Sequence, residues 1–176
     1  MRKKLNSELG RKSVDEFRNS GKNPVIVVLD NVRSHNNTGS IFRTCDAFLV
    51  EELLLCGITP VPPHRDIQKT ALGATESVSW RYFKTTSEAI SYLREKEYLI
   101  IAVEQVEGAL ELQDLKVDKD KRYAFVFGHE INGVSQEAVD KSDICVEIPQ
   151  FGTKHSFNIA VSAGIVLWDF TKKLTA

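Results

Sequence analysis

Side chains of the kinds that bind phosphate or orient a hydroxyl group gather in three separate polar segments of the sequence. They are Asn37 and Arg43 in the first segment, Glu130 in the second, and Ser156 and Asn158 in the third. An arginine presents a planar fork of donors that suits phosphate, whereas a carboxylate orients polar groups by accepting hydrogen bonds. Together the residue types suggest a polar ligand that carries negative charge.

The position of Arg43 adds to this interpretation. A helix is expected over 40–48, so Arg43 would lie near its N-terminus, where the helix dipole disfavours a cation. A basic side chain there suggests an anionic partner, of which a phosphate is the natural one. An ion pair with Asp30 or Asp46 at the surface explains Arg43 equally well, and both interpretations stay open. The preceding residues 37–39 tolerate positive φ and could form a tight turn into the helix.

The other two segments also have structural explanations. Gly128 lets a ligand approach the backbone and Glu130 can orient it, but the same residues fit a glycine turn before a helix that Ser135 caps. Ser156 would cap the long C-terminal helix expected over 156–173. Asn158, which leads into that apolar helix, needs a hydrogen-bond partner if it is buried.

Alternating strands and helices must position these segments. Strands are expected over 24–29, 52–56, 78–83, 98–103, 123–127 and 144–148, and helices over 40–48, 66–72, 86–96, 136–140 and 156–173. This order predicts an α/β fold, a mostly parallel sheet with helices on both faces. Ligands of such sheets bind beyond the carboxyl ends of the strands. That rule selects four loops, 30–39, 103–109, 128–135 and 149–156.

Several other classes of protein do not fit. The sequence lacks a GxGxxG or GxxxxGK[ST] loop and a GxSxG elbow, and its four histidines lack metal-ligand spacing, so no metal is expected. No apolar stretch reaches the length of a membrane span, and the N-terminus does not resemble a secretory signal. Cys45, Cys56 and Cys145 are expected to be reduced core thiols of a cytoplasmic protein.

The charge of the chain is unevenly spread. The 176 residues carry a net charge of −1, yet basic residues predominate over 1–24 and again over 64–84. We therefore expect a basic N-terminal arm or helix over 1–23, and one domain over 24–176. A basic face is enough to bind a polyanion, although a solvated surface explains the same charges.

Three motifs in order resemble the SpoU (TrmH-type) branch of the SPOUT RNA 2′-O-ribose methyltransferases. They span 29–48 (LDNVRSHNNTGSIFRTCDAF), 127–133 (FGHEING) and 148–161 (IPQFGTKHSFNIAV). The resemblance covers about residues 24–172, and all three motifs in this order and spacing are specific to the family. It implies an α/β fold with a deep C-terminal trefoil knot, a homodimer whose interface adjoins the site, and S-adenosylmethionine as methyl donor without a metal.

The resemblance also assigns roles to residues. The donor would be held by backbone groups of Val103, Gly128, Ile148 and Phe157, with help from Gln150. The polar active-site positions of the family match Asn37, Arg43, Glu130, Ser156 and Asn158. Arg43 would activate or orient a ribose 2′-hydroxyl for direct methyl transfer. A guanidinium is a poor base, so the proton acceptor stays open.

RNA is the partner that the resemblance implies. The sequence around 43–47 and 70–74 is most similar to the tRNA branch that modifies a D-loop guanosine, whereas the tRNA wobble-position branch and rRNA remain alternatives. Phosphate contacts would come from Arg2, Lys3, Lys4, Arg11, Lys12, Arg65 and Lys69, with further help from Arg81 and Lys84.

The sequence departs from the family pattern at three positions. Phe157 replaces leucine, His35 replaces proline, and Leu49 replaces glycine. None of them removes a polar candidate. A binding-only relative of the same fold and a flavodoxin-like nucleotide-binding protein are the two alternatives to an enzyme.

Overall fold

Seven strands form one parallel sheet in the computed structural model, which describes residues 1–176 apart from the side chain of Asn6. The strands are β1 (Asn23–Asp30), β2 (Val50–Cys56), β3 (Trp80–Phe83), β4 (Tyr98–Val103), β5 (Leu110–Glu111), β6 (Arg122–Phe127) and β7 (Ile144–Glu147). Their order is β3-β2-β1-β6-β4-β7-β5, and each neighbouring pair is parallel. The predicted α/β class with a parallel sheet is confirmed.

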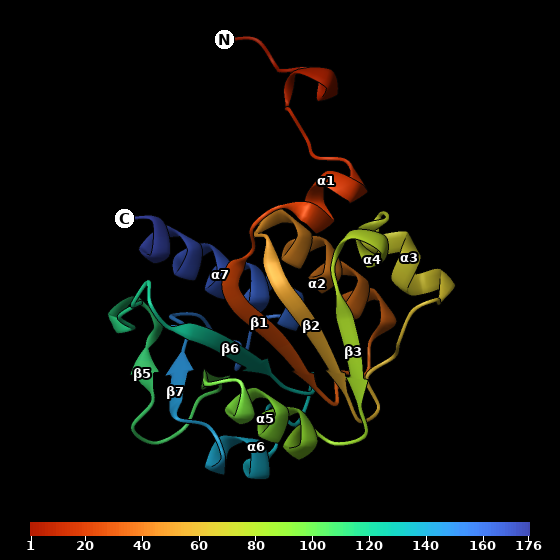
Figure 1. Cartoon of the computed structure of the whole chain (residues 1–176). Helices are drawn as coiled ribbons and strands as arrows, with labels where there is room; N and C mark the ends of the chain where they lie inside the picture. The colour runs from red at the N-terminus through yellow and green to blue at the C-terminus, as the bar shows by residue number, and fades with distance from the viewer.

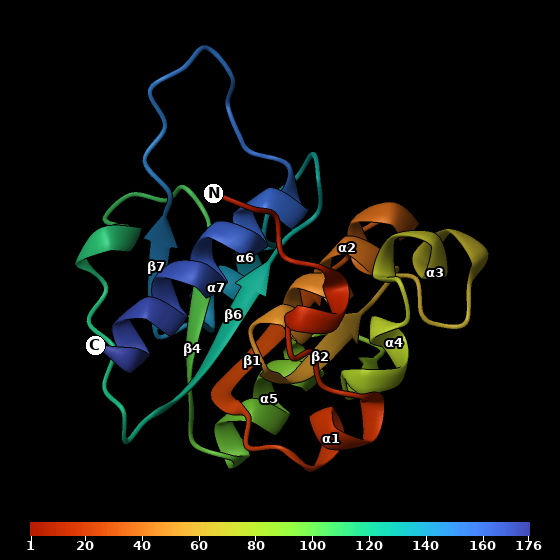
Figure 2. The ribbon, with the colours of Figure 1, turned by 90° about the horizontal axis from the view of Figure 1, so that it is seen from above.

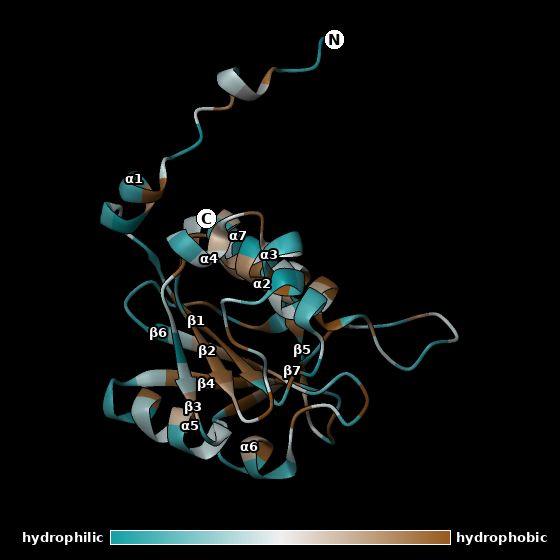
Figure 3. Cartoon of the chain, turned by 90° about the vertical axis from the view of Figure 1, so that its right-hand side faces the viewer, coloured by the Kyte–Doolittle hydropathy of each residue, from teal (hydrophilic) through white to brown (hydrophobic). Residues whose placement is uncertain are grey.

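Helices cover both faces of this sheet (Figure 1). The larger ones are α2 (His35–Ala47), α3 (Arg65–Ala71), α5 (Thr86–Glu95) and α7 (Ile159–Thr175), and the shorter ones are α1 (Val14–Asn19), α4 (Ala74–Ser77) and α6 (Gln136–Asp140). Two 3-10 turns, η1 (Asn6–Glu8) and η2 (Leu112–Asp114), complete the elements. Helices α2 and α7 lie on one face and α5 and α6 on the other, so that apolar strands separate two helical layers (Figures 1 and 3).

Strand β1 shows why the sheet is central. Val25, Val27 and Leu29 pack into the core on the α2 and α7 face, whereas Ile26 and Val28 pack into the core on the α5 face. All five side chains are buried. A β-branched run that is apolar at every position suits a parallel strand buried on both faces, and this run fixes the edge at which the polar loops emerge.

Helix α2 begins earlier and helix α7 begins later than the sequence predicts, in both cases because a side chain caps the helix at a different residue. Ser34 caps α2 by accepting a hydrogen bond from the amide of Asn37 at 3.2 Å, so residues 37–39 are helical and form no tight turn. Asn158, not Ser156, caps α7 through the amide of Ala160 at 2.9 Å. A side-chain cap fixes the first residue of a helix, and each cap sits at a site residue or close to one.

Gly39 permits the close packing of α2 against α3. A Cβ atom at this position would collide with the side chain of Thr70 and the carbonyl oxygen of Ile67. The glycine therefore serves helix packing, rather than the positive φ that the sequence suggested.

The N-terminal residues divide into two parts. Helix α1 is docked on the body, where Phe17 is buried and the Arg18 guanidinium donates to the carbonyl oxygen of Glu76 at 2.9 and 2.5 Å. Residues 1–5 and 7–12 are exposed, and the chain before α1 extends away from the rest of the molecule (Figure 1).

Candidate active site

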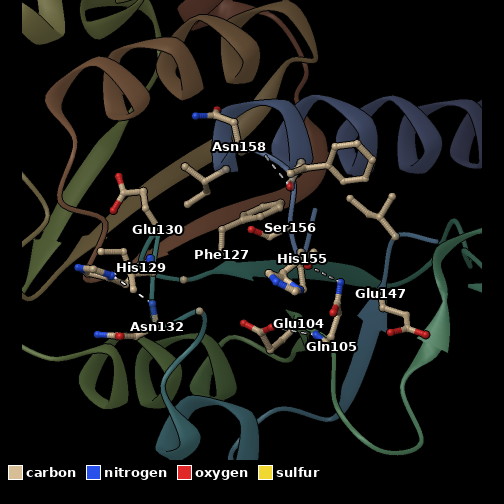
Figure 4. Close-up of a pocket in the computed structure, with 18 of the residues that line it drawn as sticks. Glu104, Gln105, Phe127, His129, Glu130, Asn132, Glu147, His155, Ser156 and Asn158 are labelled. Carbon is tan, nitrogen blue, oxygen red and sulfur yellow. Dashed lines mark hydrogen bonds between the residues drawn. The ribbon is translucent and has the colours of Figure 1, made fainter. Parts of the chain in front are cut away.

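A cavity of about 490 Å³ opens at the carboxyl ends of β4, β6 and β7. All five residues predicted to hold a donor molecule line it, namely Val103, Gly128, Ile148, Gln150 and Phe157. Glu130, Ser156 and Asn158 line it as well (Figure 4). The second and third polar segments of the sequence thus meet at the edge of the sheet that the strand rule selects.

Glu130 binds the start of α2. Its Oε2 accepts from the backbone amide of Arg33 at 3.0 Å, and its Oε1 accepts from the amide of Ser34 at 2.9 Å and from Nδ2 of Asn37 at 3.0 Å. Partial burial opposes ionisation, but the hydrogen bonds from Arg33, Asn37 and Ser34 together outweigh it and lower the pKa of Glu130. The carboxylate is therefore charged and fully engaged near neutral pH.

Asn37 continues this contact to the third segment. Its Oδ1 accepts a hydrogen bond from Nδ2 of Asn158 at 3.1 Å. Asn158 is exposed, so burial does not require it to have a hydrogen-bond partner. Its side chain instead caps the start of α7. Glu130, Asn37 and Asn158 form a hydrogen-bonded chain that joins residues more than 90 positions apart.

Ser156 lies in the loop that precedes α7 and faces the cavity (Figure 4). Its hydroxyl forms no hydrogen bond with the residues that the structure describes, and the side chain is exposed. The neighbouring residues 149–158 stand out from the body between β7 and α7 (Figure 2). Ser156 is thus available to a ligand rather than used to start the helix.

The cavity is acidic, which the sequence analysis missed. Glu104 and Glu147 line it together with Glu130. Glu104 follows β4 directly, and its Oε2 accepts from the backbone amide of Val134 at 2.7 Å. The loop after β4 was selected as a site loop, and the first residue beyond a strand end is the signal that could have singled out Glu104.

Arg43 does not reach this cavity. It is exposed on the far side of α2, at the edge of a second, apolar hollow that Phe48, Val161, Ile165 and Trp168 help to line. Val161 and Trp168 are 50% and 57% exposed, so the burial expected of this helix, which is apolar on most of its circumference, is wrong for the face that carries them.

Neither structural explanation of Arg43 holds in the described part of the chain. Asp30 accepts from Ser135 and Thr86, and Asp46 accepts from the hydroxyl of Ser77, so neither pairs with Arg43. The prediction that Arg43 lies near the N-terminus of its helix is also wrong, because Arg43 is the ninth residue of α2, beyond the first turn where the helix dipole acts. Its guanidinium remains free to meet another molecule.

The cations predicted to contact RNA are all exposed, as Arg2, Lys3, Lys4, Arg11 and Lys12 before α1, and Arg65 and Lys69 on α3. Arg2 pairs with Glu8 at 2.9 Å and Arg65 lies 3.6 Å from Asp66. Exposed pairs of this kind are weak and leave both cations able to exchange partners.

No group of three or more potential metal-ligating side chains occurs among the described residues. None of the described helices combines the length and the apolar character that crossing a membrane requires.

Comparison with known proteins defines the class. Residues 24–168 match the SpoU rRNA Methylase family, and the chain belongs to that family. The sequence is 30% identical over 163 residues to a tRNA (guanosine(18)-2′-O)-methyltransferase of Thermus thermophilus, covering 93% of this chain and 82% of the relative.

Solved structures of similar proteins share the fold. A TrmH/SpoU tRNA modifying enzyme of A. aeolicus superposes with a TM-score of 0.80 at 25% identity, over 91% of this chain and 80% of the other. An AdoMet-bound rRNA methyltransferase of Sinorhizobium meliloti superposes with a TM-score of 0.79 at 26% identity, over 93% of this chain and 62% of the other.

Proposed function

We propose that this protein transfers a methyl group from S-adenosylmethionine to a ribose 2′-hydroxyl of RNA. The observation that carries the proposal is the hydrogen-bonded chain Glu130–Asn37–Asn158 at the rim of a cavity lined by all five predicted donor-binding residues. Membership of the SpoU family and the names of the relatives support the same reaction.

The cavity fits the methyl donor chemically. S-adenosylmethionine bears positive charge on its sulfonium and its amino group, and Glu104 and Glu147 place negative charge in the lining. Backbone groups of Val103, Gly128 and Ile148 at the strand ends would hold it, with Phe157 and Gln150 completing the contacts. When bound, the donor supplies an electrophilic methyl group.

The side chains of this protein would orient the acceptor ribose. Ser156 and Asn158 line the cavity and Asn37 accepts a hydrogen bond from Asn158, so these hydroxyl and amide groups can hold the sugar with its 2′-oxygen toward the cavity. The three hydrogen bonds that Glu130 accepts make it a positioning group rather than a free base. A guanidinium at the 2′-oxygen, as Arg43 would supply, stays protonated and stabilises developing negative charge.

We further propose that two copies pair through the apolar hollow and that Arg43 of each copy completes the site of the other. The exposed apolar residues on α7 and the unpaired Arg43 at their edge support this arrangement. Mixing Asn37→Ala with Arg43→Ala chains tests it, because a mixed dimer contains one intact site. Recovery of activity above either variant alone is expected, and no recovery in proven mixed dimers would contradict the shared site.

The trefoil knot belongs to the same proposal. Strand β7 follows β6 in the sequence but lies beyond β4 in the sheet, a crossover compatible with a threaded chain, and family membership favours the knot. An experimental structure traced without a knot would contradict it.

We propose tRNA as the favoured substrate, with a D-loop guanosine as target. The Thermus thermophilus relative, named for guanosine 18 of tRNA, supports this choice. Ribosomal RNA and the wobble nucleotide are the alternatives to be tested. We assign residues 1–23 to a basic N-terminal arm or helix and 24–176 to the catalytic domain. We also propose a cytoplasmic location, which free Cys45, Cys56 and Cys145 support.

The test is transfer of labelled methyl from S-adenosylmethionine to unmodified bulk tRNA and, separately, to rRNA. Label in one RNA pool that resists alkali as a 2′-O-methyl nucleotide is expected, and Arg43→Ala should abolish it without changing thermal stability. Donor binding without label in any RNA would favour a binding-only relative, and absence of donor binding would contradict the proposal altogether.

A further inference from the structure

A buried carboxylate lies beneath the site and takes no part in the proposed reaction. Asp30 is the last residue of β1 and is only 1% exposed. Among the described residues it forms no ion pair. Its Oδ2 accepts from the backbone amide of Ser135 at 2.7 Å, and its Oδ1 accepts from the hydroxyl of Thr86 at 2.5 Å and from Asn31 at 2.9 Å. A charge buried without a cation is costly unless such hydrogen bonds compensate it.

The bond to Ser135 reaches the segment that carries Glu130. Residues 128–135 form a tight hairpin, closed by reciprocal backbone hydrogen bonds between His129 and Gly133 at 2.9 Å. A Cβ atom at Gly128 would collide with the backbone of Gly133 and Val134, so the two arms of the hairpin touch. Because its two arms are held together in this way, the orientation of the hairpin depends on how its ends are held.

The two ends of the hairpin are held differently. At the start, β6 leads into Gly128. At the finish, two consecutive amides are bound by carboxylates, that of Val134 by Glu104 and that of Ser135 by Asp30. Glu104 lies in the cavity, where a ligand can compete for it, whereas Asp30 is buried and does not line the cavity.

We propose that Asp30 is a positioning residue for methyl transfer. Through the amide of Ser135 it sets the angle of the hairpin, so that Glu130 meets Arg33 and Ser34 and Gly128 lines the cavity. The inference rests on the proposed function. The opposite oxygen of Asp30 binds the hydroxyl of Thr86 at the start of α5, and among the described residues this hydroxyl forms no hydrogen bond with Glu130 or with the hairpin, so the two contacts of the carboxylate can be tested separately.

Three variants test the two contacts of Asp30 separately. Ser135→Pro removes the amide donor, and the φ of −59° at Ser135 already suits proline. Ser135→Ala is the matched control, because the hydroxyl of Ser135 makes no capping hydrogen bond. Thr86→Val removes the other bond of Asp30 with little change of shape, and therefore costs stability without touching the hairpin.

We expect Ser135→Pro to lower kcat roughly 10- to 100-fold, the size of effect that a misplaced reactive group produces. Ser135→Ala and Thr86→Val should stay within about 3-fold of wild type when assayed below their unfolding midpoints. Equal losses of kcat in Ser135→Pro and Thr86→Val, or unchanged kcat in Ser135→Pro, would overturn the proposal.

Asp30→Ala provides the second route, should the proline variant fail to fold, because alanine removes the acceptor that asparagine would keep. Ser135→Pro then removes a bond that is already absent, so the double variant Asp30→Ala with Ser135→Pro should lose no more activity than the worse single variant. Where only Asp30→Ala folds, it should lower kcat while Thr86→Val does not. Additive losses in the double variant, or wild-type kcat in Asp30→Ala, would show that the bond does not position the site.

A measurement that does not depend on catalysis distinguishes failure of the positioning role of Asp30 from failure of the proposed function. The amides of Arg33 and Ser34 donate to Glu130, so their hydrogen exchange reports the hairpin position directly. Exchange should accelerate in Ser135→Pro and not in Thr86→Val. If wild type methylates no RNA yet exchange responds in this way, the proposed function fails and the positioning role of Asp30 stands. Unchanged exchange in Ser135→Pro would overturn the inference alone.

Discussion

Replacing Glu130 by glutamine tests whether its carboxylate holds the segment at the start of α2 by hydrogen bonds. In wild type both oxygens accept hydrogen bonds, from the amides of Arg33 and Ser34 and from Asn37. A glutamine can place its carbonyl oxygen toward Ser34 and Asn37, but its NH₂ group then opposes the N–H of Arg33. The change removes one charge-assisted hydrogen bond and weakens two others without altering the volume of the side chain.

The structure sets the size of the effect. A hydrogen bond to a charged group contributes about 1.5–3 kcal/mol, and partial exposure of Glu130 lets water replace some of that loss. We expect a loss of about 1.5 kcal/mol at neutral pH, which for a domain of this size lowers Tm by roughly 3–6 °C. Methyl transfer should fall with it, since Asn37 loses one of the contacts that orient it.

The pH dependence gives the sharper assay. The folded-state pKa of Glu130 lies below its ordinary value of 4.5, so this carboxylate stabilises the fold above that value. The contribution is lost as the pH falls through the folded-state pKa, where wild type carries a neutral carboxyl group much like the amide. The difference in Tm between wild type and Glu130→Gln should therefore be full at pH 7 and shrink below about pH 4.

One control variant completes this experiment. Glu107→Gln removes an exposed carboxylate that forms no hydrogen bond within the described residues, and should leave Tm unchanged at both pH values. A Tm difference for Glu130→Gln that is absent at pH 7, or equally large in acid, would refute this role of the carboxylate. A variant that keeps its Tm but loses the acidic limb of its pH–rate profile would instead identify Glu130 as the proton acceptor.

Three further outcomes follow from the structure. Gly39→Ala should destabilise the protein by about 1–3 kcal/mol in urea unfolding, because its Cβ would collide with α3, whereas Gly152→Ala, with open space around it, should be neutral; equal effects would contradict the close helix packing. Trp168→Glu should give monomers by light scattering with little methyl transfer, and an active dimer would exclude the apolar hollow as the interface. Deleting residues 1–12 should weaken RNA binding at low salt and leave donor affinity unchanged, since this segment lies before the docked helix α1; unchanged RNA affinity at matched salt would remove the segment from the RNA contacts.

The sequence predicts the sheet well because each strand is marked by the pattern of its own residues. The β-branched run in β1 is apolar at every position, which is compatible with few structures other than a buried parallel strand. Parallel strands then place their carboxyl ends together, so the loop with Asn37, the loop with Glu130 and the loop with Ser156 were predicted to meet before any contact was known. The hydrogen bonds that join Asn37 to Glu130 and to Asn158 beside the cavity confirm this part of the reasoning.

The start of α2 could not be predicted in the same way. Asparagine favours turns and caps over helix interiors, so the run of residues 36–39 reads locally as a loop. In the folded protein Glu130, 93 positions later in the chain, binds Asn37 and the two amides that precede the helix. A tertiary contact of that range overrides the local preference and leaves no trace in the nearby sequence.

The buried carboxylate of Asp30 was missed for a related reason. An acidic residue at a strand end is most often solvated, and only the positions of Thr86 and Ser135 turn this one inward. The exposed face of α7 was missed because an almost wholly apolar helix predicts burial without saying which molecule covers it.

The geometry of α2 explains why one chain cannot present all its site residues to one substrate. Asn37 and Arg43 are six residues apart on the same helix, a rotation of about 240° at 3.6 residues per turn. Asn37 points to Glu130 and Asn158, and Arg43 therefore points away from them, toward the apolar hollow beside α7. A helix that carries two proposed site residues on different faces can serve the proposed reaction only if a second surface meets its outer face. In a two-fold pair built on that hollow, each copy of α2 would complete its own cavity with Asn37 and its partner's with Arg43, so dimerisation and catalysis would be lost together.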